Sequence, residues 1–232
     1  MEELFPDTKC AYLNSCAGNV VTGTQFEEDG IPGITYPPGN PKGMKEKLRS
    51  QYAYAAALAT CAYYAITKNA RESETDTLAF CRRMYIGKVD HSKDHLAAQA
   101  KEALKLYEKE GHTPEAKKWC AKFRLGNVYA CGAILQRAAL PKTDEIELNA
   151  IRIGDCGIAT IPFEPYCTIG TYIKEHSPFA MTIANGYCCG YHSYLPTLKA
   201  HPDCYESSKM PFMPGTAEAI GEKLSEMLNT LK

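Results

Sequence analysis

Residues 144–164, DEIELNAIRIGDCGIATIPFE, constrain the fold more than any other stretch of the chain. Apolar residues recur through 146–153, Gly154-Asp155 is a turn dipeptide, and the run 156–163 is again rich in β-formers. This pattern predicts a β-hairpin that ends on Glu164. A carboxylate directly after a buried strand has little freedom to reach water, so it needs a cation, a hydrogen-bond donor or a metal.

Helices and further strands alternate around the hairpin. We expect N-caps at Ser92 and Thr216, and burial of the Ala-rich part of the first long helix. The chain should form one α/β domain over residues 1–232, with a mixed sheet flanked by helices, as part of a larger layered domain. Strands are predicted at 8–14, 77–89 and 179–185, and helices at 44–66, 92–111, 113–123, 126–139, 165–177 and 215–231.

Charge and cysteine content exclude several classes of partner. The net charge is −1, from 26 Lys and Arg against 27 Asp and Glu, so no basic surplus predicts a nucleic-acid partner. No run approaches the roughly 18 apolar residues that span a bilayer, and the first ten residues lack the pattern of a secretory signal. The 11 cysteines include no C-x-x-C pair, which predicts that most of them are buried thiols in a reducing compartment, and a cytoplasmic location.

Polar residues gather where three predicted strands end, at 14–19, 161–166 and 185–197. Such strand ends are where α/β proteins tend to build sites. Each stretch also has a purely structural interpretation. NSCAGN suits a turn, Glu164 suits the start of a helix, and NGYCCGYHSYLPT suits an aromatic turn.

The cysteines and histidine of 185–197 suggest two further kinds of site. Cys188, Cys189 and His192 make a poor zinc set, because we expect the side chains of adjacent cysteines to point in divergent directions. A cysteine nucleophile at Cys16 or Cys188 would need a histidine within hydrogen-bond reach. The sequence does not show such a pairing.

Four segments precede the last predicted helix in this order: NSCAGN, IRIGDCGIATIPFEPY, ANGYCCGYHSYLPT and CYESS. Together with that helix, they resemble the later part of the catalytic domain of the neutral/alkaline ceramidase family. The resemblance is best over 145–231 and is recognisable again at about 1–20. It implies a shared fold and a zinc-dependent hydrolase that splits a small amphipathic acyl-amide into a fatty acid and a free base.

The resemblance also implies roles for individual residues. It places the family's zinc glutamate on Glu164 and its zinc tyrosine on Tyr194, with Tyr187 and Tyr191 as fallback positions. A further active-site tyrosine falls on Tyr205. Asn19 is a second candidate catalytic residue, and Tyr191 with His192 are candidate substrate-binding residues.

Two departures from the family pattern alter these expectations. The family's zinc histidines lie upstream of the segment that matches NSCAGN, and this sequence begins at Met1, so we expect low zinc occupancy. Val21 occupies the family's serine position, with Thr22 one residue late and Ser15 several early, so no nucleophile is assigned. The chain is then either a hydrolase portion completed by another chain or by self-association, or a non-catalytic relative that binds ligands or serves as a scaffold.

Overall fold

The computed structural model describes residues 9–20, 55–70, 76–202 and 204–232. It divides the chain into two compact units, one of residues 1–12 and 21–73, the other of residues 13–20 and 74–232. The prediction of a single domain over 1–232 stays a prediction.

The smaller unit contains a helix over residues 55–64 that continues as the π-helix η1 (Ala65–Asn69). This agrees with the later part of the predicted helix 44–66, whose residues 44–54 lie outside the described ranges. The expected burial is wrong, because none of residues 55–70 is buried. Alanine and leucine favour a helix by propensity alone, whereas burial requires a packing partner that local sequence does not specify.

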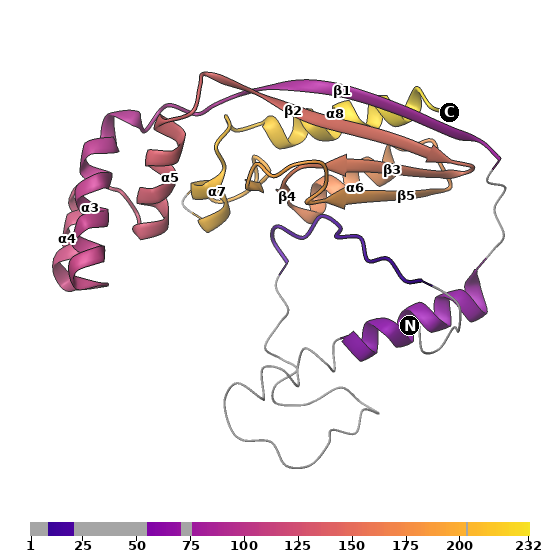
Figure 1. Ribbon diagram of the computed structural model, residues 1–232, viewed down its shortest axis with the longest axis horizontal. Coiled ribbons are helices and arrows are strands. Elements are labelled where there is room, and N and C mark those ends of the chain that lie inside the picture. Colours follow the sequence, from indigo (N-terminus) through magenta and orange to yellow (C-terminus); the bar gives the residue numbers. More distant parts are fainter. Residues whose placement is uncertain (1–8, 21–54, 71–75, 203) are drawn as a thin grey trace, which may run out of the picture. The chain divides into compact units, whose positions relative to one another are not determined.

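The larger unit is built on a four-stranded mixed sheet, which confirms the predicted α/β class (Figure 1). The strand order is β1-β2-β3-β5, where β1–β2 and β2–β3 are antiparallel and β3–β5 is parallel. Gly154 and Asp155 form the hairpin turn between β2 and β3, as predicted. The strands are β1 (Leu78–Lys88), β2 (Thr143–Ile153), β3 (Cys156–Ile161) and β5 (Met181–Gly186).

One face of this sheet forms the main core with two helices. Helices α6 (Cys167–Glu175) and α8 (Thr216–Asn229) pack against it, and α8 crosses β1, β2 and β3. Small and branched residues on the strands allow this close approach, among them Ala150, Ala159 and Ala184. Hydrophobic burial on this face is the main source of the unit's stability.

The opposite face, here the open face, carries apolar side chains of which none is buried. They alternate along the strands with the core residues, as the two-residue period of a strand requires. The predicted association with another chain or a second copy stays a prediction, and the open face would be the surface available for it. The open face consists of Leu78, Phe80, Met84, Ile86, Ile151, Ile153, Ile158, Met181 and Ile183.

Helices after β1 form a second, smaller core. It contains η2 (Asp94–Leu96), α3 (Ala97–Glu110), α4 (Pro114–Lys122) and α5 (Val128–Ala138). Gly111 ends α3 as predicted, and the Thr113 hydroxyl accepts from the backbone of Ala116 to cap α4. The prediction that Ser92 caps α3 is wrong. A 3-10 turn lies between Ser92 and α3, and Leu96 takes the N-cap position of α3.

The start of α8 differs from the prediction in the same way. Gly215 holds the N-cap position with a φ of 93°, and Thr216 is the first helical residue. The Thr216 hydroxyl donates instead to the Met213 carbonyl at 2.7 Å. A glycine in the left-handed conformation therefore occupies the N-cap position, and no side chain caps this helix.

Arg137 ties α5 to the segment around α7 (Tyr205–Lys209). Its guanidinium is only 6% exposed and donates to the carbonyls of Met210, at 3.0 Å, and Ser208, at 3.4 Å. Burial lowers the pKa of Arg137 from its ordinary value. No helix in the described ranges is both long and apolar enough to cross a membrane.

Candidate functional site

The parallel strands β3 and β5 explain why distant segments meet at one edge of the sheet. Ile161 at the end of β3 pairs with Gly186 at the end of β5. The chain leaves both strands in the same direction, so the residues that follow them become neighbours. These are the predicted site segments 161–166 and 185–197.

A short second pairing then places Glu164 beside Tyr194. Strand β4 (Glu164–Pro165) runs parallel to β6 (Tyr194–Leu195), with Glu164 opposite Tyr194 and Pro165 opposite Leu195. The backbone N–H of Glu164 donates to the Ser193 carbonyl at 2.9 Å. The structure therefore brings together the two residues that the sequence predicts to share a site.

Three tyrosines surround the Glu164 carboxylate, and we call this group the Glu164 cluster: Glu164, Tyr187, Tyr191 and Tyr194. The Tyr187 hydroxyl donates to Oε2 at 2.8 Å, and the Tyr191 hydroxyl donates to Oε1. The Tyr187 and Tyr191 rings stack with centroids 6.5 Å apart. Both carboxylate oxygens are thus held by phenol donors.

The surroundings raise the pKa of each of these phenols, although Tyr187 and Tyr191 are 40% and 60% exposed. Desolvation, followed by the hydrogen bond to Glu164, raises the pKa of Tyr191 and of Tyr194 to about 12 each. The same causes raise the pKa of Tyr187. The three tyrosine hydroxyls are therefore O–H donors at neutral pH and remain so well above it.

The loop that carries two of these tyrosines has an unusual backbone. Tyr187, Cys189 and Ser193 have φ values of 57°, 64° and 73°, in the left-handed region that non-glycine residues rarely adopt. Backbone N–H groups of Tyr187 and His192 anchor the loop on the carbonyls of residues 163 and 162, at 2.9 and 2.8 Å. Such strain persists only where surrounding contacts impose it.

This backbone contradicts one expectation from the sequence. The side chains of Cys188 and Cys189 do not diverge, because their Sγ atoms lie 3.6 Å apart. The left-handed conformation at Cys189 turns the second side chain back toward the first. Burial raises the pKa of Cys188, which argues against that thiol as a nucleophile at neutral pH.

The NSCAGN turn lies against β4, and its Asn19 has a structural role. Residues 9–14 have no regular structure and are exposed, so the strand predicted at 8–14 is wrong over its described part. The Gly18 N–H donates to the Pro165 carbonyl at 2.8 Å. The Asn19 Oδ1 accepts from the Cys167 N–H, also at 2.8 Å, and so caps α6 from another part of the chain.

Cys16 in the same turn is a core thiol. It is 6% exposed, and burial raises its pKa to about 12. A thiol with that pKa is protonated at neutral pH, which argues against Cys16 as a nucleophile.

Tyr205 extends the aromatic set, whereas His192 faces the core. The Tyr205 ring lies 5.6 Å from that of Tyr194 and is 43% exposed. The His192 ring lies 5.3 Å from Phe163 and 5.8 Å from Phe212, and burial lowers its pKa. The catalytic and substrate-binding roles assigned to these residues and to Asn19 stay predictions.

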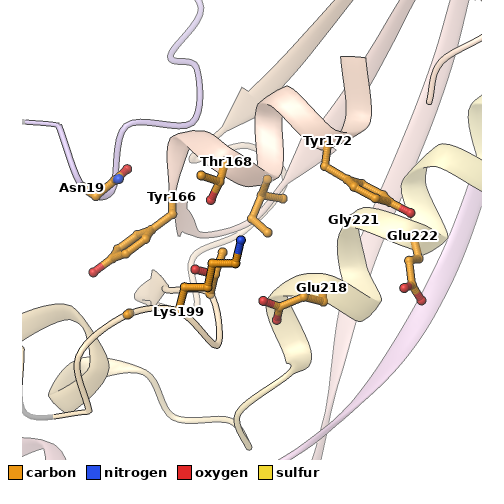
Figure 2. A pocket seen from close by; sticks show the side chains of 11 residues that line it. Asn19, Tyr166, Thr168, Tyr172, Lys199, Glu218, Gly221 and Glu222 are labelled. Carbon is orange, nitrogen blue, oxygen red and sulfur yellow. The ribbon is translucent and has the colours of Figure 1, made fainter. Parts of the chain in front are cut away.

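A cavity of about 430 Å³ lies between α6, α8 and the turn at 197–200, and sequence reasoning missed most of its lining. Figure 2 shows Asn19 and Tyr166 on one side and Glu218 with Glu222 on the other. Glu218 accepts from the Leu198 N–H at 2.9 Å, and its other oxygen is buried without a partner in the described part of the chain. The volume falls in the range of small-ligand sites.

Tyr166 is the lining residue that the sequence could have indicated, since it is the last residue of the predicted site segment 161–166. Its hydroxyl donates to Glu206 at 3.4 Å and lies 3.6 Å from the Cys204 sulfur. The lining residues on α8 carry no signal beyond ordinary polar positions of an amphipathic helix.

The Glu164 cluster does not by itself fit a zinc ion. Zinc sites normally take about four ligands, mostly histidine nitrogen, cysteine sulfur or carboxylate oxygen. Over residues 9–20, 55–70, 76–202 and 204–232, no three His, Cys, Asp or Glu side chains gather to hold a metal. The cluster supplies one carboxylate and protonated phenols, so the sequence-based expectation of zinc stays a prediction.

Replacing Glu164 with glutamine should lower the pKa of Tyr191 and Tyr194. We expect a shift from about 12 toward the ordinary value of 10.0 that stops short of it, because burial is the larger cause and remains. A spectrophotometric titration of tyrosinate absorbance measures the shift. Glu145→Gln, at an exposed position of β2, is the matched control and should leave the curve unchanged.

The raised pKa values of Tyr191 and Tyr194 also determine how the free energy of unfolding changes at alkaline pH. An unfolded tyrosine ionises near pH 10, whereas Tyr191 and Tyr194 keep their protons to about pH 12. Their contribution to the free energy of unfolding is complete below pH 10 and is lost as the pH rises to about 12. Identical titration curves for the wild type and Glu164→Gln would contradict the contacts described above.

Comparison with known proteins shows a likeness of fold alone. No protein-family model matches the sequence, and no curated protein matches it. The crystal structure of neutral ceramidase from Pseudomonas aeruginosa is similar, with a TM-score of 0.50 and 15% identity, over 90% of this chain and 39% of that chain. A structure described as ceramidase complexed with C2 aligns over 39% of this chain and 15% of that one, with 21% identity and a TM-score of 0.34.

The aligned length limits what this likeness means. The chain spans about 39% of the length of the Pseudomonas aeruginosa protein. At 15% identity the likeness concerns the arrangement of helices and strands. The chain has a mixed α/β fold similar to part of a neutral ceramidase.

Proposed function

We propose that this chain provides part of the catalytic domain of a ceramidase-like hydrolase that cleaves the linear amide C–N bond of an amphipathic acyl-amide. The observation that carries the proposal is the Glu164 cluster, in which one carboxylate at the end of β3 is ringed by three tyrosines. Its occurrence in a fold similar to neutral ceramidase supports the proposed substrate class.

The chemistry of the cluster suits an amide. A protonated phenol can donate to an amide carbonyl and to the oxyanion that develops from it. A fixed carboxylate can accept the amide N–H or orient a water molecule. Tyr194 and Tyr191 are the proposed donors, Glu164 the proposed acceptor, and Tyr205 a neighbour that shapes the aromatic wall.

We also propose that Glu164 and Tyr194 act as zinc ligands only when further ligands join them. The described residues do not complete such a set, so another chain or a second copy would supply the remainder. The open face is a large apolar surface through which that partner could associate. This arrangement predicts that the isolated chain retains little zinc.

The test combines metal content with amide hydrolysis. Purified chain is incubated with and without added Zn²⁺, its bound zinc is measured by elemental mass spectrometry, and release of fatty acid from an N-acyl sphingosine is followed. We expect little bound zinc without addition. After Zn²⁺ is added at a protein concentration that allows two copies to associate, we expect release of fatty acid that Glu164→Ala abolishes and the exposed control Glu145→Ala retains. Protein that binds no zinc and releases no fatty acid after zinc addition would overturn the proposal for this chain.

One set of observations favours a second candidate function, a non-catalytic binding module. The cavity between α6 and α8 is large enough for a small ligand, while the sequence has Val21 at the family's serine position. In that case an acyl-amide binds without turnover, and Thr168→Trp, which fills the cavity, removes binding while Glu164→Gln retains it. If Glu164→Gln removes binding while Thr168→Trp retains it, the result supports the hydrolase.

A further inference from the structure

The two adjacent cysteines of the Glu164 loop form a close thiol pair that the proposed function does not use. Their Sγ atoms are 3.6 Å apart, close enough for an S–H···S contact. Cys189 is exposed and Cys188 is half-buried, so small solutes can reach the pair. We propose that Cys188 and Cys189 are a reversible modification site, where a peroxide converts the dithiol to a vicinal disulfide.

The backbone explains why this pair is suited to the reaction. In ordinary extended or helical chain, neighbouring side chains point apart. Here Cys189 has a φ of 64°, and the two Sγ atoms lie 3.6 Å apart. Ring closure therefore needs a movement of little more than one bond length, since a disulfide bond is about 2.0 Å long.

Adjacency also makes the disulfide easy to reduce again. Consecutive Cα atoms lie about 3.8 Å apart, below the roughly 4.4–6.8 Å found across ordinary disulfides. The ring is therefore strained, and strained disulfides are the labile ones. This predicts a reversible change in place of a permanent structural crosslink.

The reaction balances with a peroxide as the oxidant. The exposed Cys189 sulfur attacks one peroxide oxygen, an S–O bond forms, the O–O bond breaks, and one water leaves. Cys188 then attacks the Cys189 sulfur, the S–S bond forms, the S–O bond breaks, and a second water leaves. Two thiols lose two electrons and two protons in total, and hydrogen peroxide is reduced to two waters.

The exposed thiol is the reasonable point of attack. Cys189 is exposed and Cys188 is half-buried, so peroxide meets Cys189 first. The second step is intramolecular, so its effective concentration is far above that of any free thiol.

Oxidation of the cysteine pair should alter the Glu164 cluster, because the same loop carries both. Tyr187 precedes the pair and Tyr191 follows it closely, and the hydroxyls of both hold the Glu164 carboxylate. The Cys188 N–H donates to the Ile161 carbonyl at 3.3 Å, so closing the ring pulls on the anchor between loop and strand. We expect the oxidised loop to lose part of its protection against hydrogen exchange.

Other cysteines provide internal controls. Cys120 and Cys131 also interact but are 1% and 0% exposed, so peroxide should not reach them in the folded chain. Cys167 is exposed and has no cysteine adjacent in the sequence. The proposal does not depend on amide hydrolysis, because each readout below follows thiols or backbone amides.

The first experiment treats the folded full chain with equimolar hydrogen peroxide, alkylates it in denaturant, digests it with trypsin and weighs the peptide 175–199. We expect this peptide to escape alkylation and to be lighter by two hydrogen atoms, until dithiothreitol restores both thiols. The disulfide should form at least about tenfold faster than peroxide oxidises Cys167, which is followed as the loss of Cys167 that can still be alkylated. Persistent alkylation of both cysteines, or sulfinic acid on Cys189 beside a free Cys188, would overturn the proposal.

Single variants separate the internal bond from other products. Cys188→Ser should stop at a sulfenic acid on Cys189 that dimedone traps, and Cys189→Ser should react at the slow rate of Cys167. A disulfide between two chains that survives in dilute protein would also count against the proposal.

Hydrogen exchange tests the link to the Glu164 cluster. Oxidised wild type should exchange faster over residues 181–196 than reduced wild type, while peptides of α8 stay unchanged. Peroxide-treated Cys188→Ser should not show the increase. Equal exchange in both redox states would overturn the coupling.

Discussion

Replacing Gly18 with alanine is expected to detach the NSCAGN turn from the strand that carries Glu164. A Cβ atom at this position would lie 2.2 Å from the Glu164 carbonyl oxygen, 2.8 Å from its carbon and 3.1 Å from the Pro165 carbonyl carbon. All three are backbone atoms, so no side chain can rotate away. The clash also breaks the Gly18 N–H bond to Pro165.

We expect the Gly18→Ala variant to lose about 2–4 kcal/mol from the free energy of unfolding, measured by urea denaturation and circular dichroism. The same shift of the backbone moves Glu164, so the tyrosinate titration of the cluster should change as well. Together these results would show that the turn and the candidate site form one packed unit.

Gly132→Ala is the matched control. Gly132 lies inside α5, and an added Cβ there would meet no atom within 4 Å. Alanine favours the helix over glycine, so this variant should gain about 0.5–1 kcal/mol. If the two variants had equal stability, the close approach of Gly18 to β4 would be wrong.

The contrast between these glycines shows what the sequence could and could not predict. The hairpin of β2 and β3 was predictable, because runs of β-forming residues and the Gly154-Asp155 turn are local signals. The need for glycine at position 18 arises from a backbone segment nearly 150 residues further along the chain. No local pattern records such a contact.

The candidate site divides in the same way. Glu164 and Tyr194 were expected to share a site, and their strand pairing places them together. The pairing itself was not predicted, since β4 and β6 have only two residues each and lack a periodic signal. The left-handed conformations of Tyr187 and Cys189 were likewise hidden, because tyrosine and cysteine carry no preference for them.

Predictions were wrong where the same residue type is compatible with more than one local structure. The segment 8–14 contains apolar residues but exposes Tyr12 and Leu13, at 79% and 48%. Ser92 and Thr216 are good caps by type, yet a 3-10 turn and a left-handed glycine take those positions.

Replacing Phe163 with alanine should produce the largest loss of stability among the substitutions considered. Phe163 is 0% exposed, and its ring lies 5.8 Å from that of Phe212 and 5.3 Å from that of His192. Truncating a buried phenylalanine costs about 3–5 kcal/mol, from lost transfer free energy and the cavity that remains. Thermal and urea unfolding measure the loss.

The consequence should extend to the site, because Phe163 is the link between the sheet and Glu164. Its carbonyl accepts the Tyr187 N–H at 2.9 Å, so a collapse of the core here displaces both the carboxylate and a phenol that holds it. We therefore expect the tyrosinate titration of Phe163→Ala to move in the direction of Glu164→Gln, in whatever fraction of the protein remains folded.

Phe80→Ala is the control that gives this result its meaning. Phe80 is the same residue type on the open face and is 60% exposed, so its truncation should change the free energy of unfolding by no more than about 0.5 kcal/mol. A small loss at Phe80 beside a large loss at Phe163 confirms that the sheet has one packed and one open face in solution. A loss of several kcal/mol at both positions would mean that another layer covers the open face, and the burial described for that face would then be wrong.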